Sequence, residues 1–249
     1  MTTPMSPPDQ AASSAAAALA KAVVANWQAA LGTELLGVYL IGSLAHGGFS
    51  RRYSDVDMAV ISEHGLSAEA IERVRGEAAA LSPEWGPKVS VFWTDRRFAI
   101  GRFPPLDRID YLDRPVVLWE RERMQPARPT LEEIRAYLRG APFASWAERA
   151  RSFARDTALD PKDRKPYLRA LLYPARFCYS YVTGRMGSND DAVAFLQERP
   201  QAGLDVASIE QALQCRRAAA DPEPLFSLRA ILPAQVDACE ALILATDAT

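Results

Sequence analysis

The chain has 249 residues, of which 49% are hydrophobic, and a formal net charge of −2 at pH 7. This length can form one large domain or two modest ones, and we expect two. A net charge so close to zero provides no general attraction to nucleic acid or to an anionic membrane surface, so neither is an expected partner. The three cysteines and two histidines show no zinc-ligand spacing, which favours three reduced, buried thiols.

The alanine-rich stretch from Ala11 to Ala30 predicts a helix. It does not have the pattern of a secretion signal or a membrane span, because no positive side chain precedes it and Lys21, Asn26 and Gln28 interrupt the apolar run. We therefore expect a soluble, cytoplasmic protein without membrane association.

Short apolar runs alternate with a helical segment over the next part of the chain. The helical segment is residues 67–81, where apolar residues recur at helical spacing and Ser82-Pro83 ends the pattern. The alternation predicts a small mixed sheet backed by helices. The predicted strands are residues 36–41, 56–61, 89–93 and 116–119.

From residue 120 the strand signals cease, and polar residues with prolines up to 129 resemble a linker. The rest of the chain has helical patterns only. Two capping boxes predict helix starts, one at Thr130 with Glu133 and one at Ser145 with Glu148. A third helix is expected over 167–183, bent at Pro174 and ended by Gly184. Three more are expected, beginning at Ser188 and covering 206–219 and 225–245.

These elements predict an α+β chain with two domains. Residues 1–125 are expected to form the domain with the small mixed sheet and its flanking helices. Residues 126–249 are expected to form an all-α helical bundle.

The first part of the candidate site is a strand that runs into Gly42-Ser43. The missing Cβ of a glycine in this turn lets the backbone approach a phosphate closely. Ser43 can offer its hydroxyl and amide to phosphate oxygens at the start of a following helix, where free amides favour anions. Gly42 and Ser43 are therefore candidate triphosphate-binding residues.

The second part is the pair Asp55 and Asp57, which lie two residues apart at the start of the next predicted strand. The two-residue period of a strand points both carboxylates to one face. Side by side they repel unless a cation lies between them, and Mg²⁺ prefers carboxylate and phosphate oxygens. Such ions assist in-line displacement at a nucleotide phosphorus. Asp55 and Asp57 are therefore the candidate catalytic residues and metal ligands.

Each motif alone is more often structural, because Gly-Ser turns and Asp-x-Asp pairs are common in loops. Their combination is more specific: a buried strand, Gly-Ser, a short gap, and Asp-x-Asp opening a second apolar strand. Through Gly42, Ser43, Asp55 and Asp57 the chain resembles the nucleotidyltransferase superfamily that includes DNA polymerase β-like enzymes. The segment 176–185, with 192–200 after it, looks like the C-terminal helical domain of aminoglycoside adenylyltransferases of the streptomycin and spectinomycin group.

The resemblance implies transfer of AMP from ATP, or of a nucleoside monophosphate from another nucleoside triphosphate, to a hydroxyl of a small molecule. It implies Mg²⁺ on Asp55 and Asp57, triphosphate contacts by Gly42 and Ser43, and a phosphate contact by Arg176 from the helical domain. It also suggests antibiotic resistance. For Arg176 the alternative is an ordinary surface arginine on an amphipathic helix.

The third carboxylate that such enzymes place on a neighbouring strand has no counterpart here. The alternating apolar residues Val89, Val91 and Trp93 put Lys88 and Ser90 on the face of Asp55 and Asp57. Neither is an acid, and an ammonium there would compete with a divalent cation.

Asp95, at the end of the same strand, has the opposite parity to Lys88 and needs a bulge or bend to take the acid's place. Asn189 stands where the family carries a phosphate-binding lysine. The mostly basic run 160–166, with Arg169 beyond it, favours a neutral or anionic acceptor if it lines the site. The alternative is a solvated connection between elements.

Three functions are consistent with these residues. The first is an active nucleotidyltransferase. The second is a binding or regulatory protein that kept the fold and lost turnover, with Lys88 in place of the acid. The third, a nucleotidyltransferase acting on RNA or protein, is the weakest, because interleaved basic and aromatic residues are missing. The acceptor, the preferred base, the number of metal ions and the oligomeric state stay open.

Overall fold

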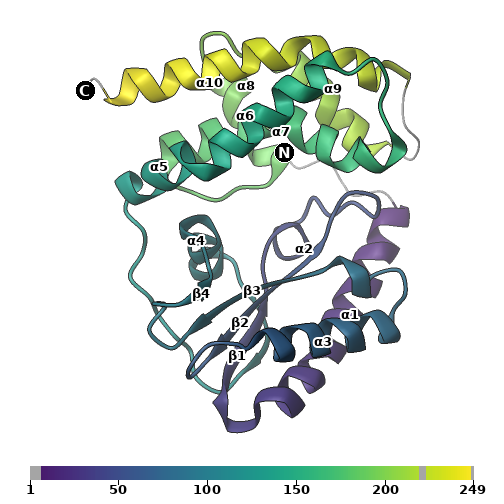
Figure 1. The fold of residues 1–249 in the computed structure, drawn as a ribbon, viewed down its shortest axis with the longest axis vertical. Helices are drawn as coiled ribbons and strands as arrows, with labels where there is room; N and C mark the ends of the chain where they lie inside the picture. The colour runs from purple at the N-terminus through teal and green to yellow at the C-terminus, as the bar shows by residue number, and fades with distance from the viewer. Residues whose placement is uncertain (1–6, 219–222, 248–249) are drawn as a thin grey trace. The chain divides into compact units, whose positions relative to one another are not determined.

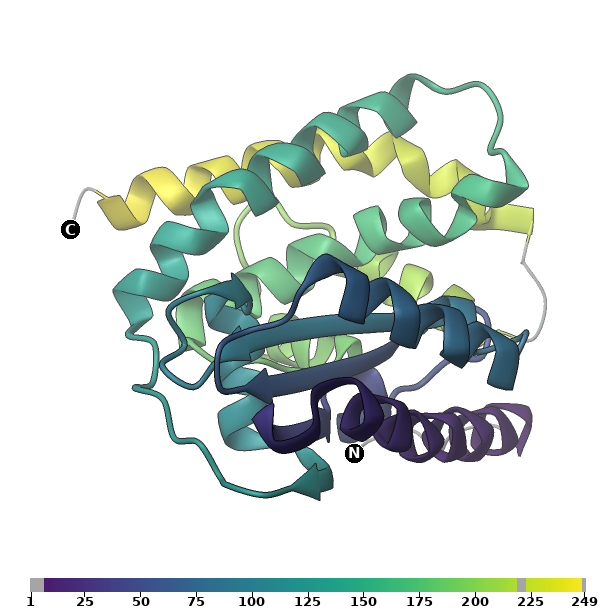
Figure 2. The ribbon, with the colours of Figure 1, turned by 60° about the horizontal axis from the view of Figure 1, so that its bottom comes forward.

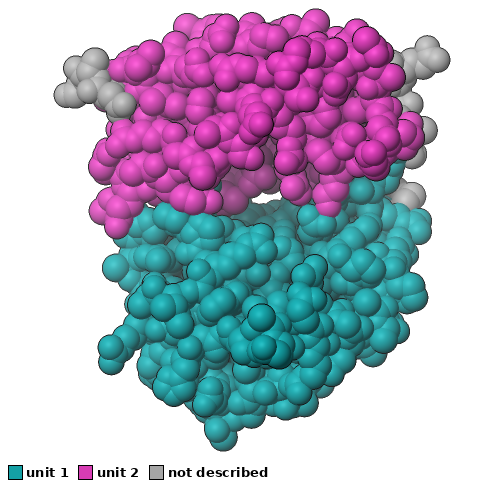
Figure 3. All heavy atoms as spheres, viewed as in Figure 1, with its two compact units in different colours: residues 1–129 teal, residues 130–249 magenta. Residues whose placement is uncertain are grey.

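The structure is a computed structural model that describes residues 7–218 and 223–247. The chain divides into two compact units, residues 1–129 and 130–249, which Figure 3 shows in different colours. Within the described ranges, no helix combines the length and the apolar character needed to cross a membrane.

Unit 1 is built on a five-stranded mixed sheet. The strand order is β4-β3-β2-β1-β5, with β2 and β3 parallel and the other neighbours antiparallel. The four predicted strands are confirmed, and their ends shift by two residues at most. β4 was not predicted. The strands are β1 (Leu35–Leu40), β2 (Val56–Ser62), β3 (Val89–Asp95), β4 (Gly101–Arg102) and β5 (Val116–Glu120).

Helices cover both faces of this sheet. α1 and α3 lie on one face, and Figure 2 shows them in front of the strands. α4, which was not predicted from the sequence, lies on the opposite face (Figure 1). The helices are α1 (Pro7–Leu31), α2 (Ser43–His46), α3 (Ala68–Leu81) and α4 (Pro105–Asp113), with 3₁₀ turns η1 (Gly32–Glu34) and η2 (Gly86–Lys88).

The two faces carry separate apolar clusters, which follow from the alternation of strand side chains. Val56, Met58 and Val60 of β2 point into the larger cluster beneath α1 and α3. Ala59 and Ile61 point into the smaller one, which includes Tyr111 of α4. Odd-numbered residues of β2 therefore lie on the α4 face, and Asp57 is one of them.

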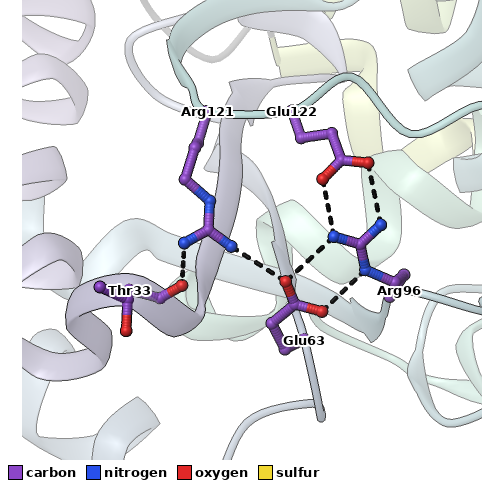
Figure 4. Close-up of polar contacts among 5 residues, drawn as sticks. All are labelled: Thr33, Glu63, Arg96, Arg121 and Glu122. Carbon is purple, nitrogen blue, oxygen red and sulfur yellow. Dashed lines mark hydrogen bonds and ion pairs between the residues drawn. The ribbon is translucent and has the colours of Figure 1, made fainter.

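An ion-pair network joins segments at the end of β2 remote from Asp57 (Figure 4). Arg96 donates two hydrogen bonds to Glu63, at 2.7 and 3.0 Å, and two to Glu122, at 2.8 and 2.6 Å. Arg121 also donates to Glu63, at 2.9 Å, and to the carbonyl of Thr33. Bidentate pairs in a shared network hold their geometry better than an isolated surface pair. The network therefore ties together the chain just before β1 and just after β2, β3 and β5.

Replacing Glu63 by Gln removes the charge shared by both arginines. The hydrogen bond from Arg96 holds the pKa of Glu63 below its ordinary value. Its contribution to stability is therefore complete above about pH 5 and is lost as the pH falls through the lowered pKa. We expect Glu63→Gln to lower the thermal midpoint at neutral pH by a few degrees, and the difference from wild type to shrink in acid. Unfolding followed by circular dichroism between about pH 3 and pH 7 measures both effects.

Glu72→Gln is the matched control, because Glu72 forms a single exposed pair with Arg75 on α3. Exposed pairs of this kind contribute little. An equal loss of midpoint in both variants would contradict a special role for the network.

In the described residues of unit 2, 130–218 and 223–247, the regular elements are all helices. The predicted caps at Thr130 and Ser188 are confirmed as complete capping boxes, and Gly184 ends its helix in the left-handed conformation. The predicted start at Ser145 is wrong. That helix begins at Ala141, because Pro142 fits the first turn of a helix. The helices are α5 (Leu131–Arg139), α6 (Ala141–Arg155), α7 (Arg164–Thr183), α8 (Asn189–Glu198), α9 (Val206–Arg217) and α10 (Leu232–Asp247), with 3₁₀ turns η3 (Pro161–Asp163) and η4 (Glu223–Ile231).

Helix α7 packs against all the other α-helices of unit 2 and contains a proline in its middle. Pro174 has no N–H, so it cannot donate to the carbonyl of Ala170 one turn earlier. The indole N–H of Trp146, from α6, donates to that carbonyl instead, at 2.9 Å. The Trp146 ring also stacks on Tyr173, with centroids 4.6 Å apart. A side chain from a neighbouring helix thus supplies the hydrogen bond that the proline removes.

This compensation predicts a coupled effect of two substitutions. Trp146→Phe should cost about 1–3 kcal/mol of unfolding free energy through the unpaired carbonyl alone, in addition to lost packing. In a Pro174→Ala background the cost should be smaller, because the restored backbone N–H pairs with Ala170. A double-mutant cycle by urea unfolding measures the coupling, and strictly additive effects would count against it.

Candidate active site

The site is organised around the turn that follows β1. Gly42 has φ of +70° and ψ of −157°, a region that L side chains rarely adopt. A Cβ at this position would lie 2.5 Å from Oδ2 of Asp57. The preceding amide, of Ile41, donates to the carbonyl of Asp57 at 3.1 Å. Glycine is therefore required both by the backbone conformation and by the Asp57 carboxylate that lies against it.

The two predicted carboxylates lie where β2 begins. Asp55 directly precedes the strand, and Asp57 is its second residue. Both are half-buried. Asp57 lies on the α4 face of the sheet, whereas the predicted place of Asp55 on that face remains a prediction, because Asp55 precedes the strand. On the neighbouring parallel strand, the Cα partner of Asp57 is Ser90. The neighbouring position at which a third carboxylate was sought therefore carries a hydroxyl.

Lys88 lies outside the strand, at the end of the 3₁₀ turn η2. Its ammonium donates to the carbonyl of Arg51 at 2.9 Å and lies 4.3 Å from the ring centroid of Trp85. These contacts connect Lys88 to the loop that precedes Asp55. Its predicted place on the face of Asp55 and Asp57 remains a prediction.

Asp95 is not re-aimed toward the site. The β2–β3 register runs without a shift from Val56 opposite Val89 to Ser62 opposite Asp95, so no bulge intervenes. Asp95 is five residues beyond Ser90, or about 16 Å along the strand. Burial by itself raises the pKa of the Asp95 carboxyl. Hydrogen bonds from backbone N–H groups, including that of Ala99, have a larger effect in the opposite direction, so the net pKa lies below its usual value. Asp95 therefore serves the turn after β3.

Ser54 forms hydrogen bonds within the loop between Gly42 and Asp55. Its hydroxyl accepts the amide of Ser50 at 2.9 Å and the hydroxyl of Ser43 at 3.0 Å. The Ser54 amide donates back to the carbonyl of Ser50 at 2.9 Å. Ser43 is therefore linked directly to the residue before Asp55.

A buried acid on α4 contacts both Gly42 and His46, at the two ends of the turn. Asp110 is only 2% exposed, and its Oδ2 accepts the amide of Gly42 at 2.7 Å. Its Oδ1 is in close contact with Nε2 of His46, whose side chain is 3% exposed. Asp110 was not among the residues predicted from the sequence. The signal was present as Pro104-Pro105 ahead of apolar residues at helical spacing, which is typical of a short helix start.

The contact with Asp110 changes the role predicted for Gly42. The following helix, α2, has only four residues, and the Gly42 amide already has a carboxylate partner. We therefore expect phosphate contacts at this turn from the amide and hydroxyl of Ser43, because the space left by the missing Cβ of Gly42 is occupied by the Asp57 carboxylate.

The donor set at the start of β2 fits Mg²⁺. Mg²⁺ is commonly held by one or two carboxylates while substrate phosphates and waters complete its shell. Two acids are what Asp55 and Asp57 offer. Among the residues that the structure describes, no group of three or more histidine, cysteine or acidic side chains is arranged to hold a metal ion.

The remaining predicted site residue, Arg176, belongs to unit 2. It lies in the middle of α7 and is half-buried. Asn189 is the first residue of α8, behind the Ser188 cap, and its neighbour Asp190 pairs with Arg217. These contacts agree with a structural role for the 188–191 segment. A phosphate contact by Arg176 remains a prediction.

No protein-family model matches the chain, and no curated protein matches its sequence. A solved structure does match over most of its length. Spectinomycin adenyltransferase AAD(9) from Enterococcus faecialis, crystallised with ATP and spectinomycin, superposes with a TM-score of 0.62 at 11% identity. The match covers 88% of this chain and 98% of that one. This chain has a nucleotidyltransferase fold followed by helices.

A chain from a crystal structure of a mutant toxin–antitoxin MntA-HpeT also matches, with a TM-score of 0.30 at 19% identity. It covers 40% of this chain and 73% of that one, and a score this low does not establish a common fold. The fold resemblance and the α+β class predicted from the sequence are confirmed by the adenyltransferase match. At 11% identity the match concerns the fold alone.

Gly42→Ala tests the contact between the turn and Asp57. The new Cβ has to displace the Asp57 carboxylate, and the backbone strain should cost about 1–3 kcal/mol. If Asp57 holds the metal, Mg²⁺-dependent nucleotide affinity should fall at least about tenfold.

Gly47→Ala is the matched control. Gly47 has φ of +89°, and a Cβ added there would meet nothing within 4 Å, so its substitution adds strain without a clash. Equal losses of nucleotide affinity in the two variants, measured by calorimetry, would show that the Asp57 contact is unimportant.

Proposed function

We propose that this protein transfers a nucleoside monophosphate, AMP from ATP, to a hydroxyl of a small molecule, with Mg²⁺ as cofactor. The observation that carries the proposal is the contact between Gly42 and Asp57, which joins the Gly-Ser turn to the carboxylate pair. The fold shared with an adenyltransferase that was crystallised with ATP supports the choice of nucleotide.

The proposal assigns different tasks to the two units. Unit 1 carries Ser43, Asp55 and Asp57, so we assign it nucleotide binding and catalysis. Unit 2 is assigned acceptor binding, and Arg176 is its proposed phosphate contact. The acceptor is an aminoglycoside-type compound or another small hydroxyl compound.

The reaction joins the acceptor oxygen to the α-phosphorus and breaks the bond between the α-phosphorus and the bridging oxygen, so that pyrophosphate leaves. The proton of the acceptor hydroxyl passes to solvent water. Ser43 binds and orients the phosphates through its amide and hydroxyl. Asp55 and Asp57 would hold Mg²⁺, which would neutralise charge on the triphosphate. The half-buried position of both carboxylates limits competing water and strengthens their field.

A second function is favoured by the missing third acid. Ser90 is the Cα partner of Asp57 on the neighbouring strand, and the ammonium of Lys88 donates to the carbonyl of Arg51 in the loop before Asp55. A nucleotide-binding or regulatory protein without turnover would have this arrangement. The two functions share the binding site and differ in pyrophosphate release.

The proposal predicts metal-dependent nucleotide binding that needs both acids. Calorimetric titration of ATP and GTP into the wild type should show binding with Mg²⁺ and none with EDTA. Asp55→Ala/Asp57→Ala should lower the affinity at least about tenfold, because both carboxylates are removed from the metal.

Asp95→Asn is the matched control, because it also removes an acid, but at the end of β3 that lies away from Asp57. It should bind as the wild type does. Absence of nucleotide binding by the wild type under all conditions would refute the proposal. Binding without pyrophosphate release across a panel of hydroxyl acceptors would favour the regulatory function.

A further inference from the structure

Asp110 touches both ends of one short turn. Its Oδ2 accepts the amide of Gly42, the residue before α2, and its Oδ1 contacts His46, the last residue of α2. Within the turn, the amides of Ala45 and His46 both donate to the carbonyl of Gly42, at 3.0 and 3.1 Å. One side chain from a distant segment thus fixes the start and the end of the Gly-Ser turn.

The helix that carries Asp110 is held firmly in the apolar cluster on its face of the sheet. Ile109 and Tyr111, its neighbours in sequence, are fully buried. The Tyr111 ring packs edge-on against Tyr39 of β1, with centroids 5.0 Å apart, and its hydroxyl donates to the carbonyl of Met124 at 2.7 Å. Because α4 is anchored on both sides of Asp110, the carboxylate has little freedom to move away from the turn.

The contacts of Asp110 exclude it as a substitute for the missing third acid. Both oxygens already have partners in the turn, and the residue is 2% exposed. A buried carboxylate keeps such partners, because leaving it unpaired is costly. Its effect on the nucleotide therefore has to pass through the position of the turn.

The turn lies directly between two carboxylates. The Asp57 carboxylate lies against the Cα side of Gly42, and the Asp110 carboxylate binds its amide. The orientation of this one residue therefore determines where Ser43 stands relative to Asp57.

We propose that Asp110 and His46 are positioning residues that form a latch, holding Ser43 in register with the metal-binding acids so that one nucleotide triphosphate can contact both. This inference rests on the proposed function, because it assigns the latch a nucleotide-binding purpose. It assigns a role in nucleotide binding to α4 and to the pair Asp110 and His46, which lie outside the Gly-Ser and Asp-x-Asp motifs.

The test combines two readouts on folded variants. Asp110→Asn keeps the shape but replaces one of the two oxygens that face Gly42 and His46 by an amide NH2 group. We expect faster amide hydrogen exchange across residues 42–46 and a Kd for ATP with Mg²⁺ raised about tenfold or more. His46→Leu should have both effects, while His46→Gln, which retains a donor, should restore part of the affinity.

Asp113→Asn is the matched control, since Asp113 lies on the same helix and pairs with Arg128. It should leave both readouts at wild-type values. If Asp110→Asn fails to fold, the two His46 variants still decide the matter.

Unchanged exchange and unchanged Kd in the latch variants, with a wild type that binds nucleotide, would overturn the latch alone. Faster exchange without a change in affinity would overturn it equally. A wild type that binds no nucleotide would overturn the proposed function and the positioning role together, whatever the exchange rates show.

Discussion

The candidate site depends on the close contact between the backbone of Gly42 and the carboxylate of Asp57. A Cβ at position 42 would lie 2.5 Å from that carboxylate, so only glycine permits the approach. The contact brings the turn after β1 and the first residues of β2 into one place. Without it, Ser43 and the acid pair would remain two separate motifs, each common in loops.

Two carboxylates contact this turn, those of Asp57 and Asp110, and they differ in burial and partners, as does Asp55, two residues before Asp57. Asp55 and Asp57 are half-buried, which leaves them partly accessible to the metal ion and phosphate that we propose they bind. Asp110 is buried and already engaged on both oxygens. The proposed roles of these acids therefore differ: Asp55 and Asp57 are the proposed metal ligands, and Asp110 supports the backbone of the turn.

Both units use distant side chains to complete backbone hydrogen bonding at irregular places. In unit 1 the amide of Gly42 bonds to Asp110, and in unit 2 the carbonyl left unpaired by Pro174 receives the indole of Trp146. Irregular backbone inside a protein is tolerated only when its polar groups find such partners. Asp110 and Trp146 therefore supply hydrogen-bond partners for the amide of Gly42 and the carbonyl of Ala170.

The sequence by itself determined the local features, namely the main strands and the caps at Thr130 and Ser188. These follow from the periods of helix and strand and from short-range hydrogen bonds. The start of α6 was placed wrongly, because Pro142 fits the first turn of a helix that begins at Ala141, four residues before Ser145. Only the tertiary structure decided that Ser90 stands opposite Asp57 and that Asp110 holds the turn. Strand register and contacts across 68 residues depend on how whole elements pack, and no local pattern of residues contains that information.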